Sequence, residues 1–409
     1  MRLRIKEICD YVSRGTTPDY VDEGANKVMN QATFSKGWLD ESNIRYTSKA
    51  NKGARIMKGD LLMASTGGGV LGKVFFFDDD DSFYADSHVT IMRNSKGANL
   101  MKYLYYYFYL RYDEINATMV KGSTNQTELQ RNYLLSYELD VPTLADQQRM
   151  VTYLDTKLSE IDHQVSLLTS KRDAYLRLKK SIINHAVTRG LNPNVKMKDS
   201  GIEWIGEVPE HWEVKRMKEL SAIGSGTTPK SGEDKYYENG IHPWLNTSDV
   251  QDCVINEAKF SITDKALNDY SVLKYYPIGT ILIAMYGGGT IGNVALMNIS
   301  ATINQACCAI VSNEKLLLPK YLFCYLKCHK KKIISLGFGG TQVNLSQAII
   351  AQLPVVLPPL PEQHALATYL DDKCAKIDTI LSNLNKQISC YGDLKRSLID
   401  EVITGKRAV

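Results

Sequence analysis

The chain carries the stretch that decides its fold twice. It reads Val141-Pro-Thr-Leu-Ala-Asp-Gln-Gln148 and, 216 residues later, Leu357-Pro-Pro-Leu-Pro-Glu-Gln-His364. The same offset brings Thr152-Tyr-Leu-Asp155 onto Thr368-Tyr-Leu-Asp371. Self-similarity that keeps its order along a chain is the signature of a repeat architecture. The chain therefore reads as a tandem duplication of a unit of roughly 210 residues.

The repeat continues upstream. Gly15-Thr-Thr-Pro18 recurs at residues 226–229, and Gly67-Gly-Gly-Val-Leu-Gly72 recurs as Gly287-Gly-Gly-Thr-Ile-Gly292. Between these framing turns, about 19–58 and 230–278, the two copies share almost nothing. A common frame that carries two divergent inserts favours two recognition surfaces of different specificity, held at a set separation.

Each copy ends in a long segment with apolar residues at steps of three and four, which is typical of a helix with a coiled-coil seam. The first segment has no internal Gly or Pro, and the second has only Gly392. The first stripe is Val151, Leu154, Leu158, Ile161, Val165, Leu168, Tyr175, Leu178 and Ile182. The second is Ala367, Leu370, Cys374, Ile377, Leu381, Leu384, Ile388, Tyr391 and Leu398. Since neither stripe is stable in water alone, we expect the two helices to pair antiparallel, each about 60 Å long.

We therefore predict an α+β protein: two similar α/β-type globules joined by two long antiparallel helices, a pseudo-two-fold tandem repeat. The remainder of each copy has short β-rich runs and Gly-rich turns, such as Thr280-Ile-Leu-Ile-Ala284. The predicted parts are a first recognition domain 1–141, a central helical spacer 142–190, a linker 191–203, a second recognition domain 204–357 and a C-terminal helical spacer 358–409.

Composition indicates an ordinary soluble protein of two or three domains. The 409 residues are 44% hydrophobic, and 49 Lys and Arg face 45 Asp and Glu, so the net charge of +4 leaves room only for a local basic groove. No apolar run is long enough to span a bilayer, and the N-terminal residues do not resemble a signal peptide. Eight scattered cysteines without CxxC spacing suggest reduced thiols. We expect a cytoplasmic protein.

The glycine loops match GxGxxG literally. A dinucleotide site requires that pattern to open a helix, so that the helix N-terminus faces the pyrophosphate. Here strand-like runs follow, Lys73-Val-Phe-Phe-Phe77 and Asn293-Val-Ala-Leu-Met297. A strand-to-strand turn is the better interpretation, and its backbone N–H groups could still approach a phosphate.

Other constellations of reactive residues are weak. Cys324, Cys328 and His329 could be drawn as metal ligands, but the matching positions in the first copy are Tyr106, Leu110 and Arg111. A structural zinc site would also need a fourth ligand, so we predict no metal. The run Asp78-Asp-Asp-Asp81 is typical of a solvated turn. Because no catalytic motif is present, we predict that the chain is not an enzyme by itself and has no catalytic residues.

The aromatic run Tyr103-Leu-Tyr-Tyr-Tyr-Phe-Tyr-Leu-Arg-Tyr112 could be a stacking platform for bases. Its counterpart, Tyr321-Leu-Phe-Cys-Tyr-Leu-Lys-Cys328, is merely apolar at the matching positions. A helix that packs into its own globule is therefore favoured. Basic residues such as Lys327, Lys330 and Lys331 are most simply read as a solvated face.

Several motifs of the chain resemble those of one known family. Asp199-Ser-Gly-Ile-Glu-Trp-Ile-Gly-Glu-Val-Pro-Glu-His-Trp-Glu-Val-Lys-Arg216 resembles a signature of the specificity subunit of type I restriction–modification systems. The Gly-Thr-Thr-Pro turns, the glycine loops, Pro358-Pro-Leu-Pro-Glu-Gln363 and Thr188-Arg-Gly190 look like the same family, in the same order over essentially the whole chain. The first copy starts at Met1-Arg-Leu-Arg-Ile-Lys-Glu-Ile8 without a counterpart of the Trp-x-Gly-x-x-Pro-x-x-Trp motif.

The resemblance implies a DNA-binding subunit whose two target recognition domains each read one half of a bipartite, asymmetric sequence. The two helices would set the spacing of the half-sites. It further implies docking of two DNA adenine methyltransferase subunits, which restriction/translocase subunits can join. No cofactor is expected on this chain, whereas S-adenosylmethionine and ATP with Mg are expected on the partner subunits.

Two other interpretations explain part of the sequence. A coiled-coil scaffold without DNA specificity would explain the helices but not two elaborate globules with divergent inserts. A nucleotide-dependent oxidoreductase would use the glycine loops but fails on their context. Salt-dependent binding to duplex DNA would favour the recognition subunit, and bound NAD the oxidoreductase.

We expect DNA contacts in the divergent regions and the glycine loops. Amides and Arg can read base edges, whereas Lys and hydroxyls mostly position the backbone. In the first domain the candidates are Arg14, Thr16, Thr17, Ser65, Thr66, Lys73, Lys121 and Asn125. In the second domain they are Thr227, Lys230, Asn246, Ser248, Tyr286, Thr290, Asn293, Thr341, Gln342 and Asn344.

Overall fold

The computed structural model describes residues 1–95, 97–121, 127–339 and 343–409. Candidates Asn125, Thr341 and Gln342 lie outside the described residues. The chain forms two compact units: unit 1 is Met1–Thr169 with Lys386–Val409, and unit 2 is Ser170–Asn385. Each unit holds one globule and half of each long helix, so the division runs through the helices and not at their ends.

The globule of unit 1 contains two main sheets. An antiparallel sheet has the order β2 (Tyr11–Arg14), β10 (Val89–Arg93), β7 (Leu61–Ala64) and β8 (Val74–Phe76). The second sheet has the order β3 (Tyr20–Val21), β5 (Arg45–Thr47), β4 (Asn26–Met29), β9 (Phe83–Ala85) and β6 (Arg55–Ile56), with β4 and β9 parallel. Leu62, Ala64, Val89 and Ile91 of the first sheet share one core with Met29 and Phe83 of the second.

Shorter elements complete this globule. The strand pairs are β1 (Arg2–Arg4) with β13 (Glu138–Asp140) and β11 (Val120–Lys121) with β12 (Glu128–Leu129). The short helices are α1 (Ile5–Ile8), α2 (Gln31–Phe34), α4 (Tyr112–Thr118) and α5 (Arg131–Ser136).

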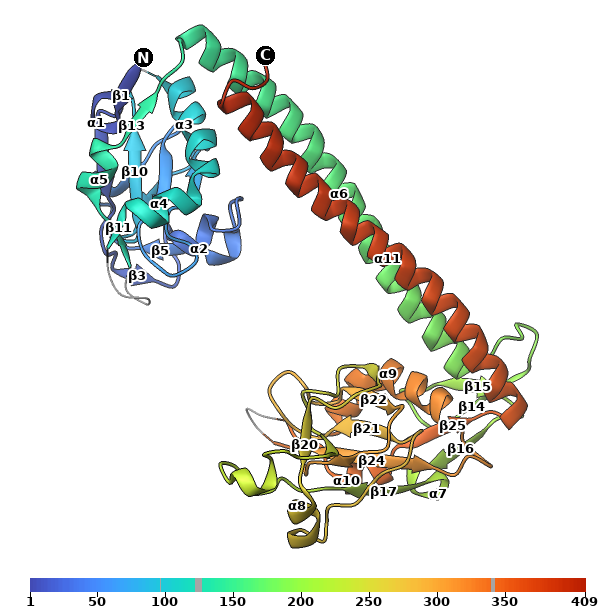
Figure 1. Cartoon of the computed structure of the whole chain (residues 1–409). Helices are drawn as coiled ribbons and strands as arrows, with labels where there is room; N and C mark the ends of the chain where they lie inside the picture. Colours follow the sequence, from blue (N-terminus) through green and yellow to red (C-terminus); the bar gives the residue numbers. More distant parts are fainter. Residues whose placement is uncertain (96, 122–126, 340–342) are drawn as a thin grey trace. The chain divides into compact units, whose positions relative to one another are not determined.

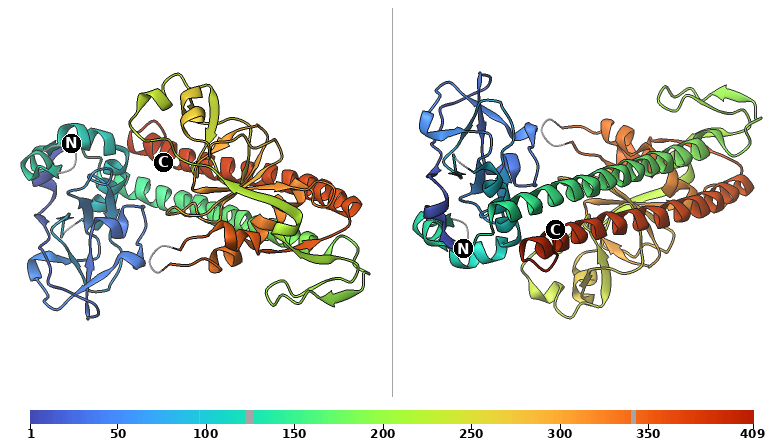
Figure 2. Two further views of the ribbon diagram at one scale, coloured as in Figure 1. Left: turned by 90° about the horizontal axis from the view of Figure 1, so that it is seen from below. Right: turned by 90° about the horizontal axis from the view of Figure 1, so that it is seen from above.

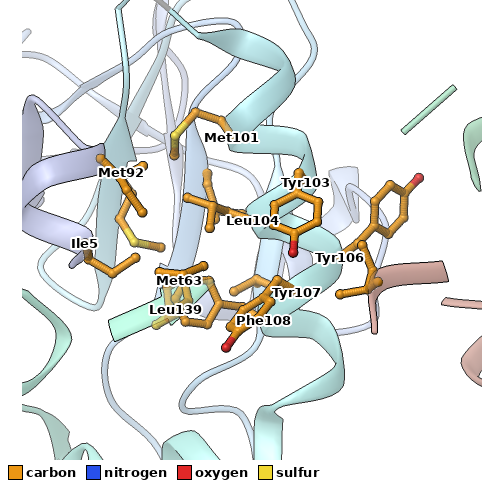
Figure 3. Close-up of a cluster of buried hydrophobic side chains, with 14 of the residues drawn as sticks. Ile5, Met63, Met92, Met101, Tyr103, Leu104, Tyr106, Tyr107, Phe108 and Leu139 are labelled. Atoms are coloured by element: carbon orange, nitrogen blue, oxygen red, sulfur yellow. The ribbon is translucent and has the colours of Figure 1, made fainter. Parts of the chain in front are cut away.

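Helix α3 (Ala98–Leu110) contains all but the last two residues of the tyrosine-rich run and packs on β7 and β8. Tyr103, Tyr106, Tyr107 and Phe108 are all buried in the core of unit 1. Figure 3 shows Tyr103, Tyr107 and Phe108 close to Met63 of β7, whereas Tyr106 points away from them, and its hydroxyl donates to the Asp155 carboxylate at 2.5 Å. The predicted packing of this helix into its own globule is confirmed, and the run is not an exposed stacking platform.

Unit 2 repeats this arrangement, but the counterpart of the four-stranded sheet has five strands and the counterpart of the five-stranded sheet has three. Its larger sheet has the order β17 (Ser221–Ser225), β24 (Cys307–Ser312), β21 (Ile281–Ala284), β22 (Val294–Met297) and β19 (Cys253–Ile255). The smaller sheet is β20 (Phe260–Ile262), β18 (His242–Leu245) and β23 (Thr302–Ile303), with β18 and β23 parallel. The two globules therefore have the same frame.

The remaining elements of unit 2 frame these sheets (Figure 1). The strand pairs are β16 (Glu213–Arg216) with β25 (Pro354–Leu357) and β14 (Met197–Asp199) with β15 (Glu207–Pro209). The helices are α7 (Met217–Leu220), α8 (Asp264–Asp269), α9 (Pro319–Ser335) and α10 (Gln347–Ala351). Both views of Figure 2 show the β14–β15 hairpin just after the end of the green helix α6.

The long helices are α6 (Leu144–Arg189) and α11 (Leu360–Ile403). Thr143 starts α6 with a reciprocal cap: its Oγ1 accepts from the Asp146 N–H at 3.2 Å and donates to the Asp146 carboxylate at 2.6 Å. In unit 1 Lys395 binds Asp162 at 2.9 Å, and in unit 2 Lys179 binds Asp378 at 2.6 Å. As residue numbers rise on one helix they fall on the other, so the helices run antiparallel.

The seam between the helices is formed by the predicted stripes, with one exception. Leu158, Ile161 and Leu398 are buried in the core of unit 1. Leu370 is buried in the core of unit 2. Leu178 is 47% exposed and does not belong to the buried seam, because the alternation of four- and three-residue steps continues from Tyr175 to residues 179 and 182 and passes Leu178 by. The predicted fold class is confirmed: two α/β globules and a pair of antiparallel helices.

Two general properties hold for the described part of the chain. None of its helices has the length and apolar character needed to cross a membrane. Within the same residues no group of His, Cys, Asp and Glu is placed to hold a metal ion. His329 is buried against Trp204 and Tyr325, and the Cys328 thiol contacts Asn184.

Candidate nucleic-acid interface

In each globule, four turns meet where the parallel strand pair ends. In the first globule they are residues 15–18, 30–34, 65–72 and 86–88, which we call the first turn cluster. In the second they are residues 226–229, 246–249, 285–292 and 304–306, the second turn cluster. The turns are tied together by backbone hydrogen bonds: Asp86 N–H donates to Met29 at 3.0 Å, and Asn304 N–H donates to Leu245 at 2.9 Å.

The Gly-Thr-Thr-Pro turn crosses the end of the neighbouring strand so closely that only glycine fits. A Cβ on Gly15 would collide with the carbonyl oxygen of Ala85, and one on Gly226 would collide with that of Ile303. Any side chain here would push the turn away from the sheet. This contact places Thr16 and Thr17, and Thr227 in the second copy, at the rim of each cluster.

An Asn turn follows the parallel strand in both inserts. Asn30 Oδ1 accepts from the N–H groups of Ala32 and Thr33 at 2.8 and 3.2 Å, and so caps α2. Asn246 Oδ1 accepts from the Ser248 N–H at 2.8 Å. These inserts share almost no sequence, yet the same side chain shapes the same turn. Asn246, predicted to contact DNA, uses its amide oxygen inside the protein.

The glycine loops join antiparallel strands, β7 to β8 and β21 to β22. Gly67, Gly69 and Gly72 have φ of 95°, 78° and 85°, and their counterparts in the second copy also have positive φ. No helix follows either loop, so the predicted strand-to-strand turn is confirmed and the dinucleotide interpretation fails. Inside the loops the N–H groups of residues 70–72 and 290–292 donate to carbonyl groups of the protein, which fixes the shape of each turn.

Three polar side chains from three turns of the first cluster form one network. The Thr66 hydroxyl lies 3.1 Å from Gln31 Oε1 and 2.7 Å from His88 Nδ1. His88 is exposed, and Gln31 and Thr66 are partly exposed. The Asp86 carboxylate beneath them accepts from the His88 N–H at 2.8 Å, while burial raises the pKa of Asp86. Gln31 and His88 were missed by sequence reasoning, although Gln31 lies in the divergent insert where DNA contacts were expected.

The second cluster has the same backbone with different side chains at those positions. Thr247, Tyr286 and Ala306 stand where the first cluster has Gln31, Thr66 and His88. Here a hydrogen bond of 2.5 Å links Thr228 to Gln305, a different pair of turns. Burial raises the pKa of Tyr286, whose ring is partly exposed. The two surfaces therefore differ in hydrogen-bonding groups where the frames agree.

Several other candidates are accessible at or near these clusters. The Arg14 guanidinium donates to Ser87 at 2.9 Å and lies 3.6 Å from Glu128. Lys121 is exposed on β11. Ser248 is exposed, and Lys230 is exposed with an ion pair to Glu233 at 2.7 Å.

The remaining candidates are occupied by internal contacts to different degrees. Ser65 and Asn293 are buried: the Ser65 hydroxyl bonds Thr90 at 2.5 Å and the Asn293 amide donates to Val250 at 2.9 Å. These two expectations need correction, because a buried side chain cannot reach DNA without unfolding its surroundings. Lys73 donates to the Ser35 carbonyl at 2.8 Å. Asn344 pairs through its backbone with Phe338, and Thr290 is partly exposed beside Tyr286.

This arrangement defines a class of protein: a tandem pair of α/β recognition globules on an antiparallel helical spacer. The family description "Type I restriction modification DNA specificity domain" matches residues 1–167 and 209–389. The chain therefore belongs to the type I restriction–modification DNA specificity family. Its members are DNA-recognition subunits, which rules out the interpretation as a scaffold without DNA specificity.

Individual relatives agree with this assignment. The MjaVIII specificity subunit of a type I restriction enzyme from Methanocaldococcus jannaschii is 23% identical over 78% of this chain and 73% of its own length. A structure of complex assembly in a type I restriction–modification system superposes with a TM-score of 0.74 at 15% identity, covering 98% of this chain and 97% of the other. The HsdS subunit of Thermoanaerobacter tengcongensis gives a TM-score of 0.51 at 16% identity, covering 100% and 97%.

Proposed function

We propose that each turn cluster reads one half of a bipartite, asymmetric duplex DNA sequence, and that α6 and α11 set the distance between the half-sites. The observation that supports this most is that the two turn clusters share the arrangement of their turns but expose different side chains. Amide and imidazole groups at the first cluster, Gln31 and His88, can hydrogen-bond base edges in the major groove. Glycine-loop N–H groups and hydroxyls suit the phosphate backbone.

The chain itself supplies recognition and not chemistry in this proposal. The outer faces of the helices dock two DNA adenine methyltransferase subunits, to which restriction/translocase subunits can be added. S-adenosylmethionine and ATP with Mg are bound by those partners. The complex works in the cytoplasm, where its DNA target lies.

The proposal is tested by binding of the full chain, together with its methyltransferase subunits, to a duplex that carries the methylated target. Alanine at Gln31, Thr66 and His88 should weaken binding to the target at least tenfold, because each lost base-edge contact typically costs about 1–3 kcal/mol. Alanine at Tyr133, which is 54% exposed on α5, serves as a control for general surface effects.

The contribution of phosphate contacts is measured separately by salt titration. Affinity should fall steeply between about 50 and 200 mM salt for both target and random duplexes, while only the target affinity responds to the triple variant. Equal losses for target and random DNA would contradict base reading by these side chains. Unchanged affinity for both would move the recognition surface elsewhere.

A further inference from the structure

The sheet of unit 1 has an open edge at β8. Within the described residues β8 pairs only with β7, on one side. The Lys73 carbonyl accepts from the Ala64 N–H and the Phe77 N–H donates to Asp60, both at 2.9 Å, so these residues face β7. The alternate residues Val74 and Phe76 direct their N–H and C=O groups to the other side. An edge of this kind is a template for another strand.

Unit 2 shows what covers the same edge. There β19 runs parallel to β22, with Cys253 opposite Ala295 and Ile255 opposite Met297. The outward N–H of Asn298 donates to the Ile255 carbonyl at 2.8 Å. β22 is the counterpart of β8. The second copy therefore has a strand, β19, at an edge that is open in the first copy.

In unit 2 one residue, Asp252, holds β19 in place beside β22. Asp252 adopts a φ of 56°, and its carboxylate accepts from the Val294 N–H and from Lys330, both at 2.9 Å. Its carbonyl oxygen accepts from Lys327 at 2.7 Å. In the first copy the positions of Lys327 and Lys330 are held by Tyr109 and Tyr112.

The first insert does not follow the same path. After α2 the chain turns at Gly37, with a φ of 87°, and Trp38 is left 60% exposed. A cleft of about 910 Å³ results, bounded by β8, by residues 35–38, by α3, and by α6 and α11. Its lining is rich in aromatic rings, including Phe75, Phe76 and Tyr105. This volume lies within the range of ligand-binding pockets.

Three of the four lysines that line the cleft are ion-paired with carboxylates. Lys102 binds Asp155 at 2.8 Å and Lys395 binds Asp162 at 2.9 Å, whereas Lys73 donates to a backbone carbonyl and keeps its charge. A nucleic-acid backbone needs several free cations, and the cleft offers one. Open backbone groups beside aromatic rings instead suit an extended peptide with apolar side chains.

We propose that β8 is a strand-addition site, on which an extended apolar segment of the methyltransferase subunit pairs parallel to β8 as β19 pairs with β22. This rests on the proposed docking of methyltransferase subunits on the helices. Leu158 of α6 and Ile399 of α11 line the cleft, so a partner on these helices reaches the open edge without a break in the interface. Because unit 2 fills its own edge, one of the two methyltransferase subunits is held more tightly than the other.

The first test is hydrogen exchange of the full chain, alone and with its methyltransferase subunits. The outward amides of Val74, Phe76 and Asp78 should exchange fast in the free chain and become protected at least tenfold in the complex. The amides of Phe75 and Phe77, already bonded to β7, should hardly change. Absence of this alternating protection in a complex that does form would overturn the proposal.

The second test separates the backbone contact from the side chain. Phe76→Pro removes one outward N–H, and Phe76→Leu is its matched control with the N–H retained. Native mass spectrometry should show two methyltransferase subunits with Phe76→Leu and only one with Phe76→Pro at the same concentration. Tyr109→Lys, which copies the second domain, should weaken the same site by partly filling the cleft with an uncompensated charge.

The outcomes distinguish the inference from the function on which it rests. If the unaltered chain binds no methyltransferase, the proposed docking on the helices fails. If Phe76→Pro keeps its melting temperature and still binds two subunits, strand addition fails and helix docking stands. If the free chain is a dimer that Phe76→Pro converts to a monomer, the occupant of β8 is a second copy of this chain and the methyltransferase assignment is wrong.

Discussion

The first and second turn clusters share the arrangement of their backbone turns but expose different side chains. Gly15 and Gly226 make the same close approach to a strand end, and Asn30 and Asn246 shape the same turn. The inserts around these residues otherwise share almost nothing. The comparison shows that a few residues with special backbone roles are enough to hold the frame, which leaves the exposed positions free to diverge.

A second difference lies on the helix that covers each sheet. Arg111 in unit 1 places its guanidinium 3.6 Å from the centre of the Tyr107 ring, a cation–π contact. Its counterpart His329 in unit 2 is buried edge-on to Tyr325 and Trp204, and burial lowers its pKa to about 4. Within the described residues its Nε2 has no hydrogen-bond partner. The same frame position is thus a permanent cation in one copy and a neutral ring in the other.

The largest effect is expected at the helix seam. Leu384 lies on the buried side of α11 and is only 4% exposed. A carboxylate at this position, in Leu384→Asp, should lower the free energy of unfolding by about 3–5 kcal/mol. Leu394→Asp, at a position 50% exposed on the same helix, is the matched control and should stay within about 0.5 kcal/mol. Denaturant titration measures both, and equal losses would contradict the seam described here.

An intermediate effect should appear in the pH dependence of unit 2. The unfolded chain protonates His329 near the ordinary histidine pKa of 6.5, whereas the folded chain does so only near 4. The unfolded state therefore binds more protons in this window, so stability is lost as pH falls from about 6.5 towards 4. We expect about 2 kcal/mol between pH 7 and pH 5.

Hydrogen exchange of the amides of unit 2 at the two pH values gives the free energy of opening of this unit, and the loss should appear in that free energy. His329→Phe should remove the pH-dependent part, because a ring of similar shape remains and does not titrate. If that variant shows the same slope as the parent chain, other groups cause it. Unit 1, with Arg111 at this position, should show no equivalent loss.

The smallest effect concerns the two ion pairs that join α6 to α11. Lys179 of the first copy binds Asp378 of the second, and Lys395 of the second binds Asp162 of the first. The Lys side chains are 25% and 30% exposed and the Asp side chains more than half exposed. Each Lys→Ala variant should therefore lose only about 0.5 kcal/mol, and less at high salt. A loss above about 2 kcal/mol in either variant would show that the pair is not screened as its exposure indicates.

The repeat, the glycine turns and the apolar stripes made the frame predictable, because each depends on local residues with a clear physical role. The strand that follows each glycine loop was predictable from the β-branched and aromatic residues after Gly72 and Gly292. Leu178 was assigned to the stripe only because it is apolar, whereas the alternating steps of four and three place residue 179 in the seam and leave Leu178 exposed.

The site was less predictable than the frame. Ser65 was chosen as a polar residue beside a glycine loop, but a hydroxyl there bonds Thr90 inside the sheet. Asn30 and Asn246 show no sequence context in common, so their shared turn could be seen only once the parallel strands were placed. For the same reason β19 and the open edge of β8 were missed: strand pairing between distant segments leaves little local signal.

The most direct test of the central claim exchanges three side chains between the clusters. Gln31→Thr, Thr66→Tyr and His88→Ala give the first cluster the residues of the second on an unchanged backbone. Methylated adenines are then mapped by single-molecule sequencing in cells that express this variant with its methyltransferase subunits. Separate reading of two half-sites predicts a change in one half of the target, with the other half and the gap retained. A target that changes in both halves, or active methylation at the original sequence, would contradict it.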